Sequence, residues 1–224
     1  SYTYFINHAT KISTRSATIL RKEQIMSTNI TIIRHAPTKY NKKGIFMGSL
    51  DIPPEPIDKN LVLEVRKQLD GTIFNAVYSS PYKRAHETAY AINNNKYDII
   101  IDERLRERNL GDWEGNTKES IQAKYPAAFS HGIMDVYYCP PHGESYKHMI
   151  ERISNFLSEI YEENSNILIV THNGVFRVMK SLITGDRLSN VFSQFESYLT
   201  PKSFTISKEI IEKIRLNPFY TVDI

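Results

Sequence analysis

The chain has 224 residues, 41% of them hydrophobic and 24% charged, an ordinary composition for a soluble globular protein with one α/β domain or two small ones. Its single cysteine, Cys139, excludes an internal disulfide and favours a reducing compartment. The longest apolar runs, such as residues 167–170, are too short to span a bilayer, so we expect a cytoplasmic protein without a membrane partner.

The net charge of +3 arises in the first 25 residues. This segment carries four basic residues against the single acid Glu23, whereas the remaining 24 basic and 24 acidic residues balance. A protein that neutralises nucleic-acid phosphates needs a basic stripe, and none remains beyond residue 25. The composition therefore does not indicate a nucleic-acid partner.

Residues 1–25 allow three interpretations. They are rich in Ser and Thr and lack the long apolar core of a secretory signal. They could form an organellar transit segment, an extension before a natural start at Met26, or an arm that packs on the domain or on a neighbouring chain. We favour the extension, followed by a single domain over residues 26–224. The sequence leaves the oligomeric state open and is compatible with a homodimer.

The first half of this domain alternates strands and helices. Residues 29–33 form an apolar run typical of a buried strand, and a loop rich in Pro and Gly follows. Apolar residues at helical spacing predict a helix over residues 58–69, and residues 74–78 read as a second strand. Ser80 is placed to cap the next helix, with Pro81 at its first position.

The second half continues the alternation. Residues 97–101 read as a third strand, and a polar and then aromatic stretch leads to an amphipathic helix over residues 144–161. A fourth strand at residues 166–170 precedes a helix over residues 174–184. Two short strands are expected near the end, at residues 203–206 and 210–216.

This alternation favours an α/β fold, specifically a three-layer α/β/α sandwich with a mostly parallel central sheet. Ligands of such sheets bind beyond the carboxyl ends of the strands. Polar residues follow each of the first four strands here, and we expect them to meet at one edge: Arg34 and His35, then Arg84, then Glu107, then His172. Guanidinium groups donate two parallel hydrogen bonds to phosphate or carboxylate oxygens, and the amino ends of helices add backbone donors. The pattern therefore predicts an anion pocket.

Each of these residues also has an ordinary structural interpretation. A lone histidine is more often a hydrogen-bonded structural residue, an arginine commonly forms a surface ion pair, and Glu107 lies in a charged run that could be a solvated face. Two histidines at equivalent strand ends favour the catalytic interpretation. The seven histidines show no H-E-x-x-H pattern and Cys139 has no paired ligand, so we expect no metal site.

Five short motifs occur in order between residues 33 and 174: IRHAPTKYN, YSSPYKRAHETA, LRERNLGDWEG, PHGES and IVTHNG. Together they resemble the signature of the histidine phosphatase superfamily, the phosphoglycerate mutase-like proteins. The resemblance covers nearly all of the chain after Met26 and weakens towards the C-terminal end. It implies that family's α/β/α fold and chemistry on a small phosphorylated substrate without a metal or other cofactor.

The resemblance implies a role for each member of the anion pocket. His35 matches the nucleophile that becomes phosphohistidine, and Glu107 matches the proton donor to the leaving group. Arg34, Arg84 and His172 match the groups that bind the transferred phosphoryl group.

Thr38 and Asn41 match polar residues that line the family's phosphate loop, and we expect Gly48 and Asn173 to contact the substrate as well. For Thr38 and Asn41 the alternative is local turn chemistry, which Thr and Asn often supply. Glu144 and Ser145 match a pair that either supports the site or begins a helix.

The chain departs from the family pattern at two glycines, which Ala36 and Asn173 replace. Ala36 adds a methyl group where the backbone approaches phosphate. The loop after Gly48 also lacks the usual L-T-x-x-G, so we expect substrate choice to depend on this region and on residues 45–47.

We favour phosphomonoester hydrolysis, as in the branch that includes α-ribazole phosphatases and broad-specificity phosphatases. Only about 30 residues separate Trp113 from Gly143, whereas the family's mutases carry longer insertions there. The alternatives are a 2,3-bisphosphoglycerate-dependent phosphoglycerate mutase and a weakly catalytic module that binds a phosphorylated ligand. Residues 125–141 either form a lid over the leaving group or pack their aromatic side chains on the domain.

Overall fold

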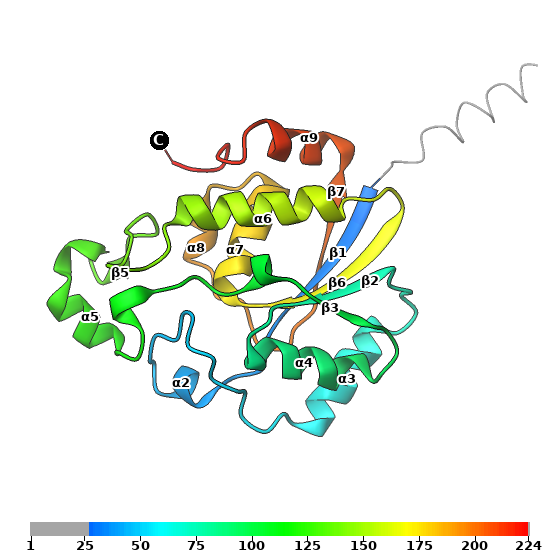
Figure 1. Ribbon diagram of the computed structural model, residues 1–224, viewed down its shortest axis with the longest axis horizontal. Coiled ribbons are helices and arrows are strands. Elements are labelled where there is room, and N and C mark those ends of the chain that lie inside the picture. The colour runs from blue at the N-terminus through cyan, green and yellow to red at the C-terminus, as the bar shows by residue number, and fades with distance from the viewer. Residues whose placement is uncertain (1–26, 224) are drawn as a thin grey trace, which may run out of the picture.

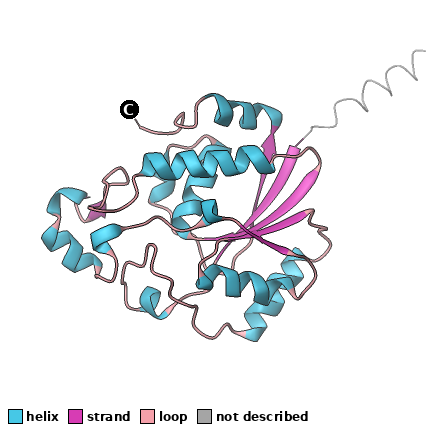
Figure 2. Cartoon of the chain, in the orientation of Figure 1, coloured by secondary structure: helices cyan, strands magenta, loops and turns pink. Residues whose placement is uncertain are grey.

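The computed structural model describes residues 27–223, and a five-stranded sheet runs through its centre (Figures 1 and 2). The interpretations of residues 1–25 lie outside the described residues. The strand order is β3-β2-β6-β1-β7, and all neighbouring strands are parallel except β7, which is antiparallel to β1. The strands are β1 (Ser27–Arg34), β2 (Ala76–Ser79), β3 (Ile99–Ile101), β6 (Ser165–Thr171) and β7 (Lys202–Ser207).

Helices cover both faces of this sheet. Side chains alternate along a strand, so Ile167 and Ile169 of β6 face one layer while Leu168 and Val170 face the other. Figure 1 shows α6 and α9 above the sheet and α3 and α4 below it, and α7 packs on the same face as α6. The predicted three-layer α/β/α sandwich is confirmed. These helices are α3 (Lys59–Leu69), α4 (Lys83–Asn93), α6 (Tyr146–Ile160), α7 (Asn173–Thr184) and α9 (Lys208–Leu216).

The remaining elements are short and lie in the connections. Trp113, which is fully buried, forms the centre of a small apolar cluster with Ile121 and Ala128, and the lobe on the left of Figure 1 holds α5 and β5. The short elements are α2 (Lys39–Lys42), η1 (Glu103–Leu105), η2 (Gly111–Trp113), α5 (Lys118–Lys124), η3 (Pro126–Ala128), β4 (Phe129–Ser130), β5 (Ile133–Met134) and α8 (Leu188–Phe192), where η denotes a 3₁₀ helix.

Two predicted elements were wrong in type or position. Residues 210–216 belong to α9 and not to a strand: the Ser207 hydroxyl accepts from Ile210 N, and the three-residue spacing of Ile211 and Ile214 places both on the buried face of a helix. Helix α4 begins at Lys83 without a side-chain cap, later than Pro81. Ser80 N donates to Val170 O at 3.1 Å, so the backbone keeps its pairing with β6 past the end of β2.

Other boundaries differ by a residue or two from the predicted ones. Ser145 accepts a hydrogen bond from His148 N and caps α6, which supports its interpretation as the start of a helix. Glu144 instead pairs with Arg152, with an oxygen-to-nitrogen distance of 2.7 Å. Within residues 27–223, the helices are too short or too polar to cross a membrane.

Candidate active site

The carboxyl ends of β1, β2 and β6 bring the polar residues together. Arg34 pairs with Thr171 in the sheet register, and His35 N donates to Thr171 O at 3.0 Å. The rings of His35 and His172 lie 5.2 Å apart between their centroids. A cavity of about 250 Å³ opens at this edge, and among its lining residues are Arg34, His35, Arg84 and Glu107. Side chains that are far apart in the sequence thus meet at the carboxyl edge of the sheet, as the positions of the predicted strand ends indicated.

His35 is buried and carries its proton on Nδ1. This nitrogen lies 2.7 Å from Ala36 O, and because a carbonyl oxygen only accepts, Nδ1 must donate. The lone pair is then on Nε2. Burial, followed by the charge of Arg84, holds the pKa of His35 well below its usual value, so the ring is neutral near pH 7. A neutral, oriented imidazole is what nucleophilic attack on phosphorus requires.

The methyl group of Ala36 lies in the core and does not line the cavity. Its side chain is buried in the apolar cluster between the sheet and α3 and α4, with Ile33 and Val65. Its backbone N donates to Thr88 Oγ1 at 2.9 Å. An alanine in place of the family's glycine is therefore accommodated by the core.

His172 is fully buried and contacts two polar side chains. Arg84 Nε donates to His172 Nδ1 at 3.2 Å, so the ring proton is on Nε2, which donates to Ser80 Oγ at 2.7 Å. Burial, then Arg84 and His35, keep the pKa of His172 well below its usual value. Ser80 was predicted only as a helix cap; its contact with His172 depends on where β2 and β6 meet, which no local pattern encodes.

Arg84 holds the loop that follows the first motif. It is fully buried at the start of α4, and its Nη1 and Nη2 donate to Leu50 O and Gly48 O, each at 2.7 Å. Gly48 has a φ of +49°, and a Cβ there would lie 2.3 Å from Glu114 Oε1. Gly48 thus lines the cavity and anchors Arg84 through its carbonyl oxygen.

Arg34 is held by the segment that follows α8. Its guanidinium carbon lies 3.8 Å from the ring centroid of Tyr198 and 4.8 Å from that of Phe195, and Nη1 donates to Glu196 O at 2.7 Å. Lys180 on α7 pairs with the Glu196 carboxylate at 3.0 Å. The sequence did not reveal these contacts, because residues 193–199 carry none of the five motifs.

The Glu107 carboxylate is positioned by the start of α7. Gly174 N donates to Oε2 at 3.1 Å, and Arg108 N donates to Oε1 at 2.9 Å. A Cβ on Gly174 would lie 2.3 Å from Oε1, so a glycine is required for this approach. Glu107 lines the cavity together with Arg34, His35 and Arg84, and is therefore not simply part of a solvated face.

The remaining predicted contacts divide into two groups. Asn41 and Asn173 line the cavity, as Gly48 does. Thr38 is fully buried and caps α2: its Oγ1 accepts from Asn41 N at 3.2 Å, while Asn41 Oδ1 accepts from Thr38 N at 2.9 Å. Thr38 is not among the lining residues, so its contribution is the local turn chemistry.

Apolar residues also line the cavity. Residues 45–47, Met134 and Phe192 belong to its lining, as do Arg108 and Arg177. In the segment 125–141, Phe129 and Tyr138 stack on Trp113 at centroid distances of 6.1 and 5.6 Å, so these aromatic side chains pack on the lobe. From that segment Met134 reaches the cavity.

Known proteins share this sequence pattern and fold. The model of the histidine phosphatase superfamily (branch 1) matches residues 30–204. Phosphoserine phosphatase 1 of Hydrogenobacter thermophilus is 28% identical over 173 residues, which cover 73% of this chain and 80% of that protein. A 2,3-bisphosphoglycerate-dependent phosphoglycerate mutase of Cytophaga hutchinsonii is 30% identical over 161 residues, which cover 67% of this chain and 74% of that protein.

A solved structure agrees with these sequence matches. Bacillus stearothermophilus YhfR has a TM-score of 0.69 and 29% sequence identity, over 79% of this chain and 90% of that one. The matched residues include all five motifs and the cavity at the carboxyl edge of the sheet. The chain therefore belongs to the histidine phosphatase superfamily, branch 1.

Proposed function

We propose that this protein hydrolyses the phosphomonoester of a small metabolite through a phosphohistidine at His35. The observation that supports this most directly is the hydrogen bond from His35 Nδ1 to Ala36 O, which leaves the Nε2 lone pair free beside Arg34 and Arg84. The name of the Hydrogenobacter relative, a phosphoserine phosphatase, favours the same reaction class. No cofactor enters this scheme.

In the first step His35 Nε2 attacks phosphorus and the bond from phosphorus to the ester oxygen breaks. Glu107 enters as the carboxylic acid and gives its proton to the departing alkoxide, which leaves as an alcohol. Arg34 and Arg84, together with the Nε2 proton of His172, stabilise the charge on the phosphoryl oxygens. The enzyme is left as phosphohistidine with Glu107 ionised.

In the second step a water molecule attacks the phosphohistidine. Glu107 accepts a proton from this water as the bond from phosphorus to nitrogen breaks. Inorganic phosphate leaves, and His35 regains its lone pair while Glu107 regains its proton. Splitting hydrolysis into two transfers replaces one difficult step by two easier ones.

The second candidate is a phosphoglycerate mutase that uses 2,3-bisphosphoglycerate. The Cytophaga relative that carries this name supports it. The two functions share the transfer to His35 and differ in the acceptor of the phosphoryl group, which is water in a phosphatase and phosphoglycerate in a mutase.

Turnover of p-nitrophenyl phosphate and of a panel of phosphorylated metabolites, with EDTA present, tests the proposal. We expect His35→Ala to lower kcat by at least about 10³-fold, since the covalent route is lost. His148→Ala, at an exposed position on α6, is the matched control and keeps full activity. Turnover by His35→Ala equal to that of the unmodified chain would disprove the mechanism. Phosphoryl transfer to phosphoglycerate without phosphate release would favour the mutase.

A further inference from the structure

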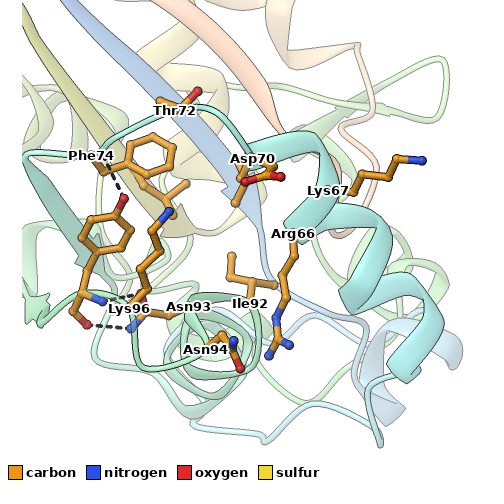
Figure 3. Close-up of a pocket in the computed structure, with 12 residues that line it drawn as sticks. Arg66, Lys67, Asp70, Thr72, Phe74, Ile92, Asn93, Asn94 and Lys96 are labelled. Atoms are coloured by element: carbon orange, nitrogen blue, oxygen red, sulfur yellow. Dashed lines mark hydrogen bonds between the residues drawn. The ribbon is translucent and has the colours of Figure 1, made fainter.

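A second cavity, of about 520 Å³, lies on the face of the sheet that α3 and α4 cover (Figure 3). It opens between the last turns of these helices, near Leu69 and Ile92. Phe74 and Tyr97 line it just before β2 and β3 begin, so it lies at the amino ends of these strands, away from His35. It shares no lining residue with the catalytic cavity.

The apolar part of this cavity is preformed. Leu69, Phe74, Ile92 and Leu168 supply its apolar lining. The Tyr97 wall is fixed by hydrogen bonds, visible in Figure 3: Asn93 Nδ2 donates to Tyr97 O at 2.6 Å, and Phe74 N donates to Tyr97 Oη at 3.3 Å. The cavity volume lies within the range of small-molecule sites, which are mostly apolar with a few polar groups that orient the ligand.

The charged residues around this apolar lining are mainly basic. The lining of the cavity includes Arg66, Lys67 and Lys96 and a single acid, Asp70, and none of the four forms an ion pair with another residue of the described chain. Figure 3 shows the Lys96 side chain extending towards Phe74, whereas Lys67 points away from the others. An apolar hollow with excess positive charge is therefore available to a ligand.

Arg66 shows that part of this charge lacks a partner. Its Nη2 donates to Ala91 O at 2.5 Å, while Nε is buried with no hydrogen-bond partner among the described residues. A buried donor without a partner is uncommon, because the missing hydrogen bond costs about 1–3 kcal/mol.

We propose that this cavity binds a small organic anion, an aromatic or short aliphatic body that carries one carboxylate or similar acidic group. The apolar body would cover Leu69, Phe74 and Ile92, which removes apolar surface from water. The anionic head would lie near the Lys96 amino group, where charge-assisted hydrogen bonds are available (Figure 3). This site is separate from the catalytic one, and its occupation does not depend on the proposed reaction.

The test is a titration of the full chain followed by methyl NMR, with 1-naphthylacetate as the probe. Its uncharged and cationic counterparts, 2-(1-naphthyl)ethanol and 1-naphthylmethylammonium, are the matched controls. We expect saturable shifts of the Ile92 and Leu168 methyl groups with the anion and at least about tenfold weaker binding of the other two compounds. Equal affinity for the three compounds, or no shift of these methyl groups up to about 5 mM anion, overturns the proposal.

Variants locate the binding site. Lys96→Ala weakens binding of the naphthylacetate by about threefold, because a partly exposed charge is removed, whereas Lys208→Ala at an exposed position on α9 leaves it unchanged. Thr72→Trp, on the loop that lines the cavity, fills the space and abolishes the methyl shifts. Binding that survives Thr72→Trp overturns the assignment. His35→Ala binds the probe as the unmodified chain does, which separates this result from any failure of the proposed reaction.

Discussion

Arg84 Nε donates a hydrogen bond to His172 Nδ1 at 3.2 Å, and this contact determines which nitrogen of His172 carries the proton. The remaining proton on Nε2 points to Ser80 Oγ at 2.7 Å. One arginine therefore orients a neighbouring donor in addition to supplying charge.

Ser80→Ala tests the other end of this arrangement. Without the hydroxyl, the buried Nε2 proton of His172 loses its partner, which costs about 1–3 kcal/mol and lets the ring reorient. We expect kcat/KM for phosphomonoesters to fall by about tenfold or more. Ser79→Ala is the matched control, since its Oγ donates to a backbone carbonyl and does not contact His172. If both variants lose activity equally, the contact between Ser80 and His172 is not what orients the ring.

The two histidines make the stability of the fold depend on pH. Burial lowers the pKa of both His35 and His172 well below the ordinary value of 6.5, so in the folded chain they stay neutral while in the unfolded chain they bind protons as pH falls through 6.5. Protonation then favours the unfolded chain, and the free energy of unfolding decreases below that pH. Each histidine contributes at most about 1.4 kcal/mol per pH unit.

Urea unfolding at a series of pH values between about 7 and 5 measures this effect. The variant His35→Gln/His172→Gln should show a flatter pH dependence in this range, because neither position then titrates. His148→Gln, at an exposed position on α6, is the control and should retain the steep dependence. A double variant as steep as the unmodified chain would contradict the assignment of these two groups.

Gly174→Ala should impair proton donation by Glu107. The added Cβ would lie 2.3 Å from Glu107 Oε1, so the carboxylate must move. Alkyl phosphates, whose leaving groups need a proton, should lose about tenfold to 100-fold in kcat/KM, while p-nitrophenyl phosphate is much less affected. The comparison variant is Glu107→Gln, which should show the same dependence on the leaving group. A uniform loss on all substrates would argue against displacement of the acid.

Tyr198→Leu should weaken phosphate binding through Arg34. The ring centroid lies 3.8 Å from the guanidinium carbon, and such a contact contributes about 0.5–2 kcal/mol. We expect inhibition by inorganic phosphate or orthovanadate to weaken by about threefold to tenfold, because Arg34 is less well held. Tyr198→Phe keeps the ring and should be inhibited by phosphate as strongly as the unmodified chain is. Equally weakened inhibition in both variants would point to the hydroxyl instead of the stacking.

The polar cluster at the carboxyl edge of the sheet was predictable to the extent that strand ends locate it. Arg34, His35 and His172 follow apolar runs that read as strands, and parallel strands end at the same edge of a sheet. The wrong strand at residues 210–216 shows the limit of this reasoning. Short apolar runs such as Ile210-Ile211 suit strand and helix alike, and packing against α6 and β7 decides between them.

The alternation of strands and helices, the family and the residue types of the polar cluster could be read from the sequence, because each of these depends on local spacing or on short motifs. Three features required the folded structure: Ser80 faces His172, Tyr198 stacks on Arg34, and a second cavity lies between α3 and α4. Ser80 and His172 are 92 positions apart in the chain. Contacts over such separations follow from strand register and helix packing, which no short stretch of sequence records.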